Sequence, residues 1–190
     1  MTLFRTAGPA LEPVTLAEAK QFLRVGHDSE DALIGGLIKA AREDVERVTG
    51  AALIEQSWRL TLDDWPAGAT VLLHRYPLKQ VADVTVYGAD GDAAVINPDD
   101  YVADGNSNPP RIRFAQTPDP VRVINGIEID FIAGFGDAGP DVPDQLRRAI
   151  LLLVAHWYEF RASVGPQDQP VSYPLGYDRL LATWKQRRLV

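Results

Sequence analysis

In residues 28–62 the chain reads DSEDALIGGLIKAAREDVERVTGAALIEQSWRLTL, and the spacing of its apolar residues changes within this stretch. Up to Gly50, apolar residues recur every three or four positions, which predicts one buried face of a long helix. This face consists of Ile34, Leu37, Ile38, Ala41, Val45 and Val48. Asp28 or Ser29 is suited to cap the helix at its start, and Gly50 is suited to end it.

Beyond Gly50 the pattern alternates between apolar and polar residues. Trp58, Leu60 and Leu62 are separated by single polar residues, which is typical of a strand with one buried face. Short apolar runs between proline, glycine and asparagine turns predict further strands. These runs are Val71–Leu73, Val84–Tyr87, Tyr101–Val102, Ile112–Phe114 and Ile127–Ile132. The frequent turns favour an antiparallel sandwich or a small barrel over a parallel sheet.

Helical patterns flank this block of strands on both sides. Thr15 and Glu18 have the spacing of a capping box, which predicts a helix from residue 16 to about residue 25. After Pro143, apolar residues return at helical spacing, and a last short helix is expected from Tyr177. The apolar stripe of the helix after Pro143 consists of Leu146, Ile150, Leu153, Trp157 and Phe160.

This order of elements predicts an α+β fold: an α-helical bundle of about four helices, two N-terminal and two C-terminal, with an inserted antiparallel β-sandwich or barrel-like block. We expect residues 1–55 to form the N-terminal helices of the core and residues 56–135 the inserted β domain. Residues 140–190 then complete the helical core. Within them, residues 162–176 contain three prolines and are expected to form an extended linker.

The composition excludes several classes of function. The chain has 190 residues, no cysteine and a formal net charge of −7, from 26 acidic and 19 basic residues. A net acidic protein is unsuited to conventional binding of duplex nucleic acid, which requires cations to displace counterions from phosphates. No signal peptide is visible, and the longest apolar run, residues 149–155, is too short to cross a membrane. We therefore expect a protein that is soluble and intracellular where it is made, with no membrane partner.

Motifs that carry chemistry are weak or absent. Gly134 to Gly139 matches G-x-G-x-x-G, but Pro140 and Pro143 delay the next helix and no later strand completes a dinucleotide fold. Asp63-Asp64 and Asp99-Asp100 stand beside turns and do not form a calcium loop. The histidines His27, His74 and His156 lack the spacing of a zinc site. The sequence therefore predicts no catalytic, cofactor-binding or metal-binding residue, and no cofactor.

The succession of segments resembles the head-to-tail connector proteins, also called adaptor or head-completion proteins, of long-tailed bacteriophages and gene transfer agents. The similarity lies in the order of short motifs along nearly the whole chain and is lowest between residues 89 and 120. The motifs are Pro13–Lys20, Leu23–Asp31, Thr49–Trp58, Leu73–Pro77, Val84–Tyr87, Ala133–Gly136, Pro143–Leu146, Ala149–Leu152, His156–Arg161 and Leu180–Arg187.

This resemblance implies a structural virion protein and not an enzyme. Connector adaptors of this kind form a homo-oligomeric ring of about a dozen copies beneath the portal protein. Such a ring extends the DNA channel, so that double-stranded DNA passes through without specific binding, and it offers a platform for the stopper or tail-side connector protein. The expected location is the virion neck, at the head–tail interface, after synthesis in the bacterial host cytoplasm.

In the family that the chain resembles, the C-terminal segment docks on the portal, and this implies docking residues near the C-terminus of this chain. Aromatic and arginine side chains are common anchors of interfaces. The alternative reading is an ordinary closing helix with cations at its C-terminal end. The candidate portal-docking residues are Tyr177, Leu181, Trp184, Lys185, Arg187, Arg188, Leu189 and Val190.

Two other functions stay open at the level of the sequence. One is a β-sandwich that binds a ligand of carbohydrate type on a helical base, with Trp65, Tyr87 and Tyr101 on one concave face. The other is a hydrolase whose site forms only in the fold, around His156 or His74. Neither of these alternatives accounts for the order of segments at both ends of the chain.

Overall fold

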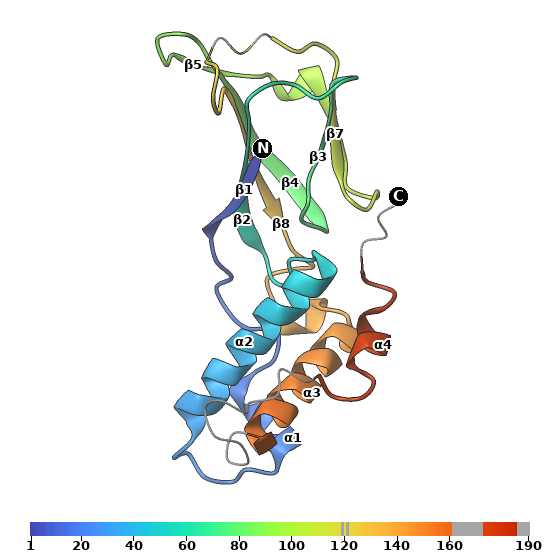
Figure 1. The fold of residues 1–190 in the computed structure, drawn as a ribbon. Coiled ribbons are helices and arrows are strands. Elements are labelled where there is room, and N and C mark those ends of the chain that lie inside the picture. The colour runs from blue at the N-terminus through green and yellow to red at the C-terminus, as the bar shows by residue number, and fades with distance from the viewer. Residues whose placement is uncertain (119, 121, 161–172, 186–190) are drawn as a thin grey trace. The chain divides into compact units, whose positions relative to one another are not determined.

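The computed structural model describes residues 1–118, 120, 122–160 and 173–185. The chain divides into two compact units, each of which is built from two separate stretches. Met1–Pro9 and Glu55–Phe135 form the β unit, and Ala10–Ile54 and Gly136–Val190 form the helical unit. The chain therefore starts in the β unit, builds part of the helical unit, and then repeats this order (Figure 1).

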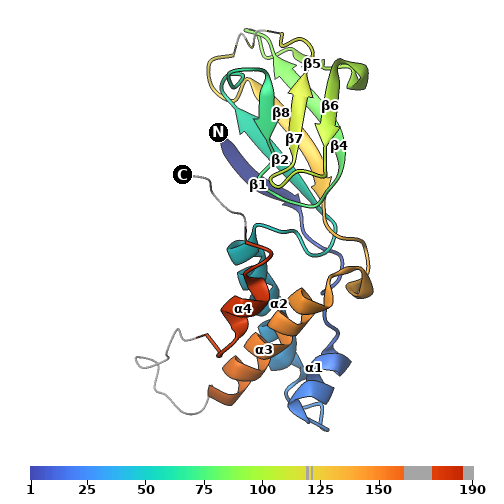
Figure 2. The same ribbon diagram turned by 90° about the vertical axis from the view of Figure 1, so that its right-hand side faces the viewer.

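Eight strands make up the described part of the β unit, and every pairing between them is antiparallel. The strands form a five-stranded sheet in the order β1-β2-β8-β4-β5 and a three-stranded sheet in the order β3-β7-β6. Figure 2 shows the smaller sheet lying over the larger one within this unit. The strands are β1 (Thr2–Ala7), β2 (Gln56–Leu62), β3 (Thr70–Leu72), β4 (Leu78–Tyr87), β5 (Ala93–Val95), β6 (Tyr101–Asp104), β7 (Arg111–Phe114) and β8 (Ile127–Ala133).

The core of the β unit lies between the two sheets, because alternate residues of the central strands are buried. The predicted set of Trp58, Leu60 and Leu62 points inward from β2, as do alternate residues of β8. Ile112 and Phe114 contribute from β7 in the smaller sheet. The sequence therefore predicted the antiparallel sandwich correctly, since this pattern marks strands with one buried face.

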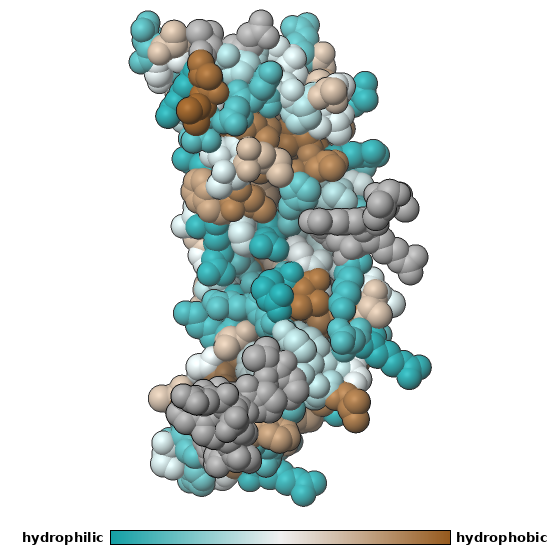
Figure 3. Space-filling model, in the orientation of Figure 1, coloured by the Kyte–Doolittle hydropathy of each residue, from teal (hydrophilic) through white to brown (hydrophobic). Residues whose placement is uncertain are grey.

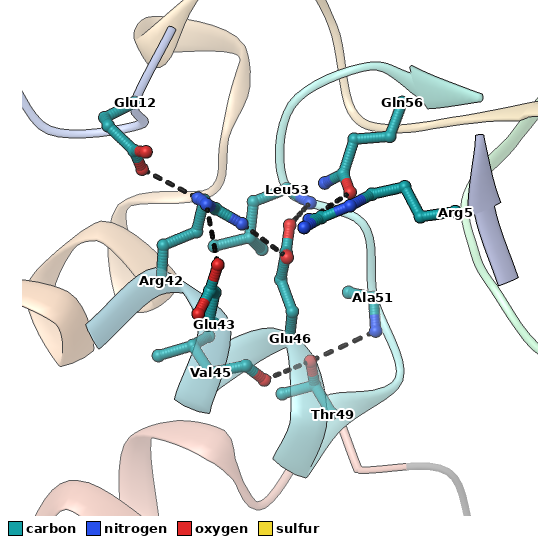
Figure 4. A network of polar contacts seen from close by, with 10 residues as sticks. All are labelled: Arg5, Glu12, Arg42, Glu43, Val45, Glu46, Thr49, Ala51, Leu53 and Gln56. Carbon is teal, nitrogen blue, oxygen red and sulfur yellow. Dashed lines mark hydrogen bonds and ion pairs between the residues drawn. The ribbon is translucent and has the colours of Figure 1, made fainter. Parts of the chain in front are cut away.

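Two strands were missed, and the first of them corrects the expected boundaries. Residues 1–55 were assigned wholly to the helical core, but Met1–Pro9 belongs to the β unit, where β1 pairs with β2. Arg5 Nη1 also donates a hydrogen bond to Gln56 Oε1 at 3.2 Å, as Figure 4 shows. Both missed strands, β1 and β5, are mostly exposed edge strands, so neither has the alternating burial that identifies a strand in sequence.

The helical unit has four α-helices among its described residues: α1 (Leu16–Leu23), α2 (Asp31–Thr49), α3 (Asp144–Phe160) and α4 (Tyr177–Leu181). Two short 3₁₀ helices, η1 (Pro98–Asp100) and η2 (Gly139–Asp141), lie in the β unit and the helical unit respectively. The two long helices α2 and α3 pack side by side, as both ribbon views show. Their buried faces use most of the expected apolar stripes, including Ile38 and Val45 of α2 and Leu146 and Leu153 of α3. Phe160 at the end of the α3 stripe is instead exposed.

The helix caps agree with the sequence for α1 and differ for α2. Thr15 and Glu18 form the expected capping box, in which the Glu18 carboxylate accepts from the Thr15 backbone N–H at 2.8 Å. The N-cap of α2 is Glu30 and not Asp28 or Ser29, and no side chain caps it. Asp28 instead accepts a hydrogen bond from Lys20 on α1, at 2.6 Å.

Candidate functional site

The C-terminal segment packs onto the helical unit through two buried side chains. Tyr177 and Leu181, one turn apart on α4, are exposed by only 1% and 0%. The helix contacts both α2 and α3. These two candidate docking residues therefore belong to the core of the helical unit, and they hold α4 in place.

Asp44 on α2 is the polar anchor of this segment. Its carboxylate accepts hydrogen bonds from the hydroxyls of Tyr177, at 2.7 Å, and Tyr173, at 3.1 Å. The two tyrosine rings are stacked, with centroids 5.1 Å apart. Burial, followed by the hydrogen bond to Asp44, raises the pKa of the Tyr177 hydroxyl, which keeps the phenol protonated as the donor. Arg47 also pairs with Asp44, so this carboxylate contacts one cation in addition to its two hydroxyl donors.

The next two candidate docking residues remain partly accessible. The indole Nε1 of Trp184 donates to Gln145 Oε1 on α3 at 3.0 Å, and Lys185 pairs with Asp178 at 2.9 Å. Both side chains are only half-buried, so part of each is available to a partner. The remaining candidates, Arg187, Arg188, Leu189 and Val190, lie outside the described residues.

A buried arginine organises the other side of α2 (Figure 4). Arg42 is exposed by 1%, and its guanidinium donates to Glu12 at 2.7 Å and to Glu46 at 2.9 Å. Burial by itself would lower the pKa of Arg42, but the carboxylates of Glu12 and Glu46 outweigh it and raise the pKa. Glu12 precedes α1 in the chain, so this cation fixes an irregular segment to the long helix.

The same network fixes the end of α2. Glu46 uses its second oxygen to accept a hydrogen bond from the backbone N–H of Leu53, at 2.9 Å. The Thr49 hydroxyl donates to Val45 O at 2.7 Å and accepts from the Ala51 N–H at 3.1 Å. The segment that follows α2 is therefore held in one conformation, which the expected Gly50 C-cap, with φ of 78°, completes.

The side chains considered for chemistry make other contacts among the described residues. No group of three or more His, Asp or Glu side chains that could hold a metal occurs among them. His156 packs its ring against Phe160 on its own helix, and His27 faces Ser29 in the loop before α2. Asp64 accepts from the neighbouring Trp65 N, Asp63 accepts from Asn125 N, 62 positions along the chain, and Asp99 and Asp100 lie in η1. No described helix is long and apolar enough to span a membrane.

The glycine-rich motif has a packing role in the helical unit. A Cβ at Gly136 would lie 2.1 Å from Asp141 Oδ2, and one at Gly139 would lie 2.8 Å from the carbonyl oxygen of Pro13. Asp141 in turn accepts from the Ala138 N–H at 3.1 Å. The close approach of Asp141 at Gly136, and of Pro13 from the segment before α1 at Gly139, leaves no room for a side chain at these two positions.

The aromatic residues of the expected carbohydrate site do not share one face. Trp65 and Tyr101 both pack against the buried ring of Phe114, with centroids 4.6 and 5.5 Å away. Tyr87 instead binds Glu128 through its hydroxyl, at 2.9 Å, on the outer side of the five-stranded sheet. This arrangement removes the basis for that alternative.

Sequence reasoning identified α4 as a segment of interest but missed its partners, Asp44 and Tyr173. Asp44 and Tyr177 are 133 positions apart, and no local pattern connects residues at such a separation. The buried Arg42 was also missed. Its signal was present, because Arg42 lies between the apolar positions Ala41 and Val45 and has Glu46 one turn away.

Comparisons with known proteins agree on one family. The family model described as "Head completion protein" matches residues 12–174. Among solved structures, a chain in the virion of a native gene transfer agent (GTA) particle superposes with a TM-score of 0.84 and 28% identity. A chain from the neck of an empty GTA particle computed with C6 symmetry gives a TM-score of 0.80 with 26% identity. A chain from the neck of a native GTA particle computed with C12 symmetry gives a TM-score of 0.77 with 28% identity. Each of these three structural matches covers 100% of this chain and 98% of the other. No curated protein matches the chain.

Proposed function

The chain belongs to the head completion protein family, and on this basis we propose that it is a head–tail adaptor that forms a ring beneath the portal in the neck of a virus or gene transfer agent. Members of this family are structural virion proteins, so the chain has a structural and not an enzymatic role. The observation that carries the proposal is the similarity over the whole chain to proteins of GTA necks. Rings of identical subunits are the usual product of head-to-tail contacts that close.

The portal contact is assigned to the C-terminal end of the helical unit. Tyr177 and Leu181 anchor α4 from inside, and Trp184 and Lys185 present accessible surface just beyond it. A half-buried tryptophan next to a cation has the composition of an interface anchor. In this arrangement Arg187, Arg188, Leu189 and Val190 extend the contact.

The ring also extends the DNA channel and supports the next connector component. The net charge of −7 fits a conduit, because like charges disfavour stable contact between a channel wall and the phosphates of a duplex. The β unit offers exposed outer surfaces for contacts other than the portal. A stopper or tail-side connector protein is the expected second partner.

The test is binding to the portal protein encoded in the same genome, scored by co-sedimentation and negative-stain imaging. The full chain is compared with a chain ending at Lys185 and with Trp184→Ala. Both changes leave the buried Tyr177 and Leu181 in place, so they test docking without opening the core. A ring beneath the portal that is weakened by either change supports the proposal and the assigned contact.

Other outcomes separate the parts of the proposal. A ring that forms unchanged with both variants keeps the adaptor role and moves the portal contact to another surface. Absence of any binding by the full chain would contradict the adaptor role itself. A matched control is Lys39→Ala, because this lysine of α2 is exposed and lies far from the C-terminal segment in sequence.

A further inference from the structure

Strand β5 leaves one edge of the five-stranded sheet open. It is the last strand in the order β1-β2-β8-β4-β5, so among the described residues only β4 pairs with it. All residues of Ala93–Val95 are exposed, and they include no proline and no charged side chain. Proline and charged side chains are two usual means of keeping an edge strand from pairing with another chain, and this edge uses neither.

The backbone groups of Ala93 and Val95 point to the open side of this edge. In an antiparallel pair, residues that exchange hydrogen bonds across the ladder alternate with residues that do not. Ile96 donates its N–H to Val84 O on β4 at 2.8 Å, so its neighbour Val95 is in the alternate position. Tyr87, which lies opposite Ala93, donates its N–H instead to the residue before β8. The N–H and C=O groups of Ala93 and Val95 are therefore directed to where an added strand would pair.

A groove of about 680 Å³ lies beside this edge. Ala94, Val95 and Ile96 line it, together with residues 116–118, which follow β7. Val95 is exposed by 64%. Figure 3 shows a hydrophobic area among hydrophilic residues at the end of the β unit where Figure 1 places β5. Open space beside a free edge is what an extended segment needs in order to pair as an additional strand.

Carboxylates surround this groove. The charged side chains that line it are Asp92 and Asp100, and both are exposed. The segments that border it, residues 88–100 and 115–118, contain four aspartates and no lysine or arginine. These aspartates are Asp90, Asp92, Asp99 and Asp100.

The arginines near this end of the β unit already contact other groups. Arg122 lies over the ring of Tyr87, and Arg113 shares a separate hollow with two of the aspartates. Arg59 pairs with both Glu128 and Asp130 on the outer side of the sheet. Carboxylates therefore remain in excess around the groove when these three cations are counted.

We propose that the open edge of β5 accepts an added strand from a second protein, an extended segment that carries lysine or arginine side chains. Added strands gain affinity from main-chain hydrogen bonds and specificity from the side chains beside the edge. The excess of carboxylates selects a basic segment, because complementary charges decide which partner surface docks. It also disfavours a second copy, which carries a formal charge of −7. This contact goes beyond the proposed adaptor role and involves the β unit, not the C-terminal segment assigned to the portal.

A short peptide of alternating lysine and valine is the probe for this edge. It is added to the isotope-labelled full chain, and binding is followed in two-dimensional amide NMR spectra. The shifts should be largest at Ala93 and Val95 and should saturate with a Kd of about 1 mM or tighter. A peptide of alternating glutamate and valine has the same strand propensity and the opposite charge, and it should bind at least ~10-fold more weakly.

Proline at position 95 tests the strand pairing itself. Val95→Pro removes an N–H that points away from β4, and an edge strand tolerates proline at such a position. It should keep the wild-type melting temperature and bind the peptide at least ~10-fold more weakly. Val95→Ala keeps the N–H, so it is the matched control and should stay within about threefold of the wild type. Ala93→Pro makes the same change at the other outward position and serves if Val95→Pro has a lowered melting temperature.

Replacement of both lining aspartates tests the selection by charge. The variant Asp92→Asn with Asp100→Asn should bind the peptide at least ~5-fold more weakly, and its affinity should depend less on salt, since exposed charges are screened. Asp144→Asn is the control, because this side chain is exposed by 98% and belongs to the helical unit.

Three results would overturn the inference: no saturable shifts at about 5 mM peptide, equal binding of the two peptides, or binding by both proline variants as strong as that of Val95→Ala. Self-association of the wild type that Val95→Pro abolishes would assign the edge to a second copy and also overturn the basic partner. Portal binding by Val95→Pro should equal that of the wild type, so the adaptor role is tested separately from this contact.

Discussion

Arg42 carries a full positive charge at a position where 1% of its surface is exposed. Isolated buried charges are costly, and the cost is offset here because Glu12 and Glu46 bond the guanidinium. The arrangement therefore depends on the presence of all its members. Removal of one partner leaves an uncompensated charge inside the protein.

Replacement of Arg42 by methionine is expected to lower the free energy of unfolding of the helical unit by about 3 kcal/mol, since the buried Glu46 loses its cation. Urea unfolding followed by circular dichroism at 222 nm measures the loss. Lys39→Met, at an exposed position of the same helix, serves as the control and should change stability by less than about 0.5 kcal/mol. A loss for Arg42→Met no larger than that of the control would contradict the role of the network.

Glu18 gives a prediction about pH. The hydrogen bond from the Thr15 backbone N–H lowers the pKa of Glu18, and Arg147 lowers it further. A carboxyl whose pKa is lower in the folded state stabilises the fold above its unfolded pKa, and this contribution disappears as the pH falls through the folded value. Glu18→Gln should therefore melt below the wild type at pH 7, and the two melting temperatures should converge below about pH 4. A difference that stays constant from pH 7 to pH 3 would exclude this origin.

At the scale of elements, α4 shows how a helix of 5 residues is held. Helices this short are unstable alone, so α4 depends on tertiary contacts. These contacts are the burial of Tyr177 and Leu181 and the hydrogen bonds of Tyr173 and Tyr177 to Asp44. Contacts with α2 therefore hold the C-terminal segment in its helical conformation.

Asp44→Ala is expected to release α4, because Tyr177 then has a buried hydroxyl without its acceptor. Hydrogen–deuterium exchange should show amides of Tyr177–Leu181 exchanging at least ~10-fold faster, which corresponds to about 1.4 kcal/mol of lost local stability. Glu43→Ala, one residue earlier on the exposed side of α2, is the matched control and should leave this exchange unchanged. Equal exchange in both variants would show that burial alone holds the helix.

At the scale of the whole molecule, the charge balance sets how the protein meets DNA. With 26 acidic and 19 basic residues, the chain carries a net negative charge, which opposes binding to the phosphates of a duplex. In a gel-shift assay, we expect the purified protein at micromolar concentration to leave a linear duplex unretarded, both at about 50 mM and at about 200 mM salt. Tight binding that weakens steeply with salt would contradict a passive conduit.

The amino-acid sequence determined the order and type of most elements. The helical spacing of Ile34 to Val48, the alternation of Trp58 to Leu62 and the Thr15 capping box each predict a structure that the fold contains. These signals are local, because periodic burial and capping involve residues within a few positions of one another. The succession of motifs also indicated the family.

The tertiary structure decided what has no local signal. The strand β1 joins the β unit through Arg5 and Gln56, which are 51 positions apart, and Asp44 meets Tyr177 across 133 positions. The ion pair of Arg59 and Asp130 exists only once β2 and β8 lie side by side. Contacts between distant segments depend on how the elements pack and leave no periodic trace in the chain. For that reason the sequence determined the elements and the family, whereas the packing alone decided which side chains anchor α4 and which surfaces remain exposed.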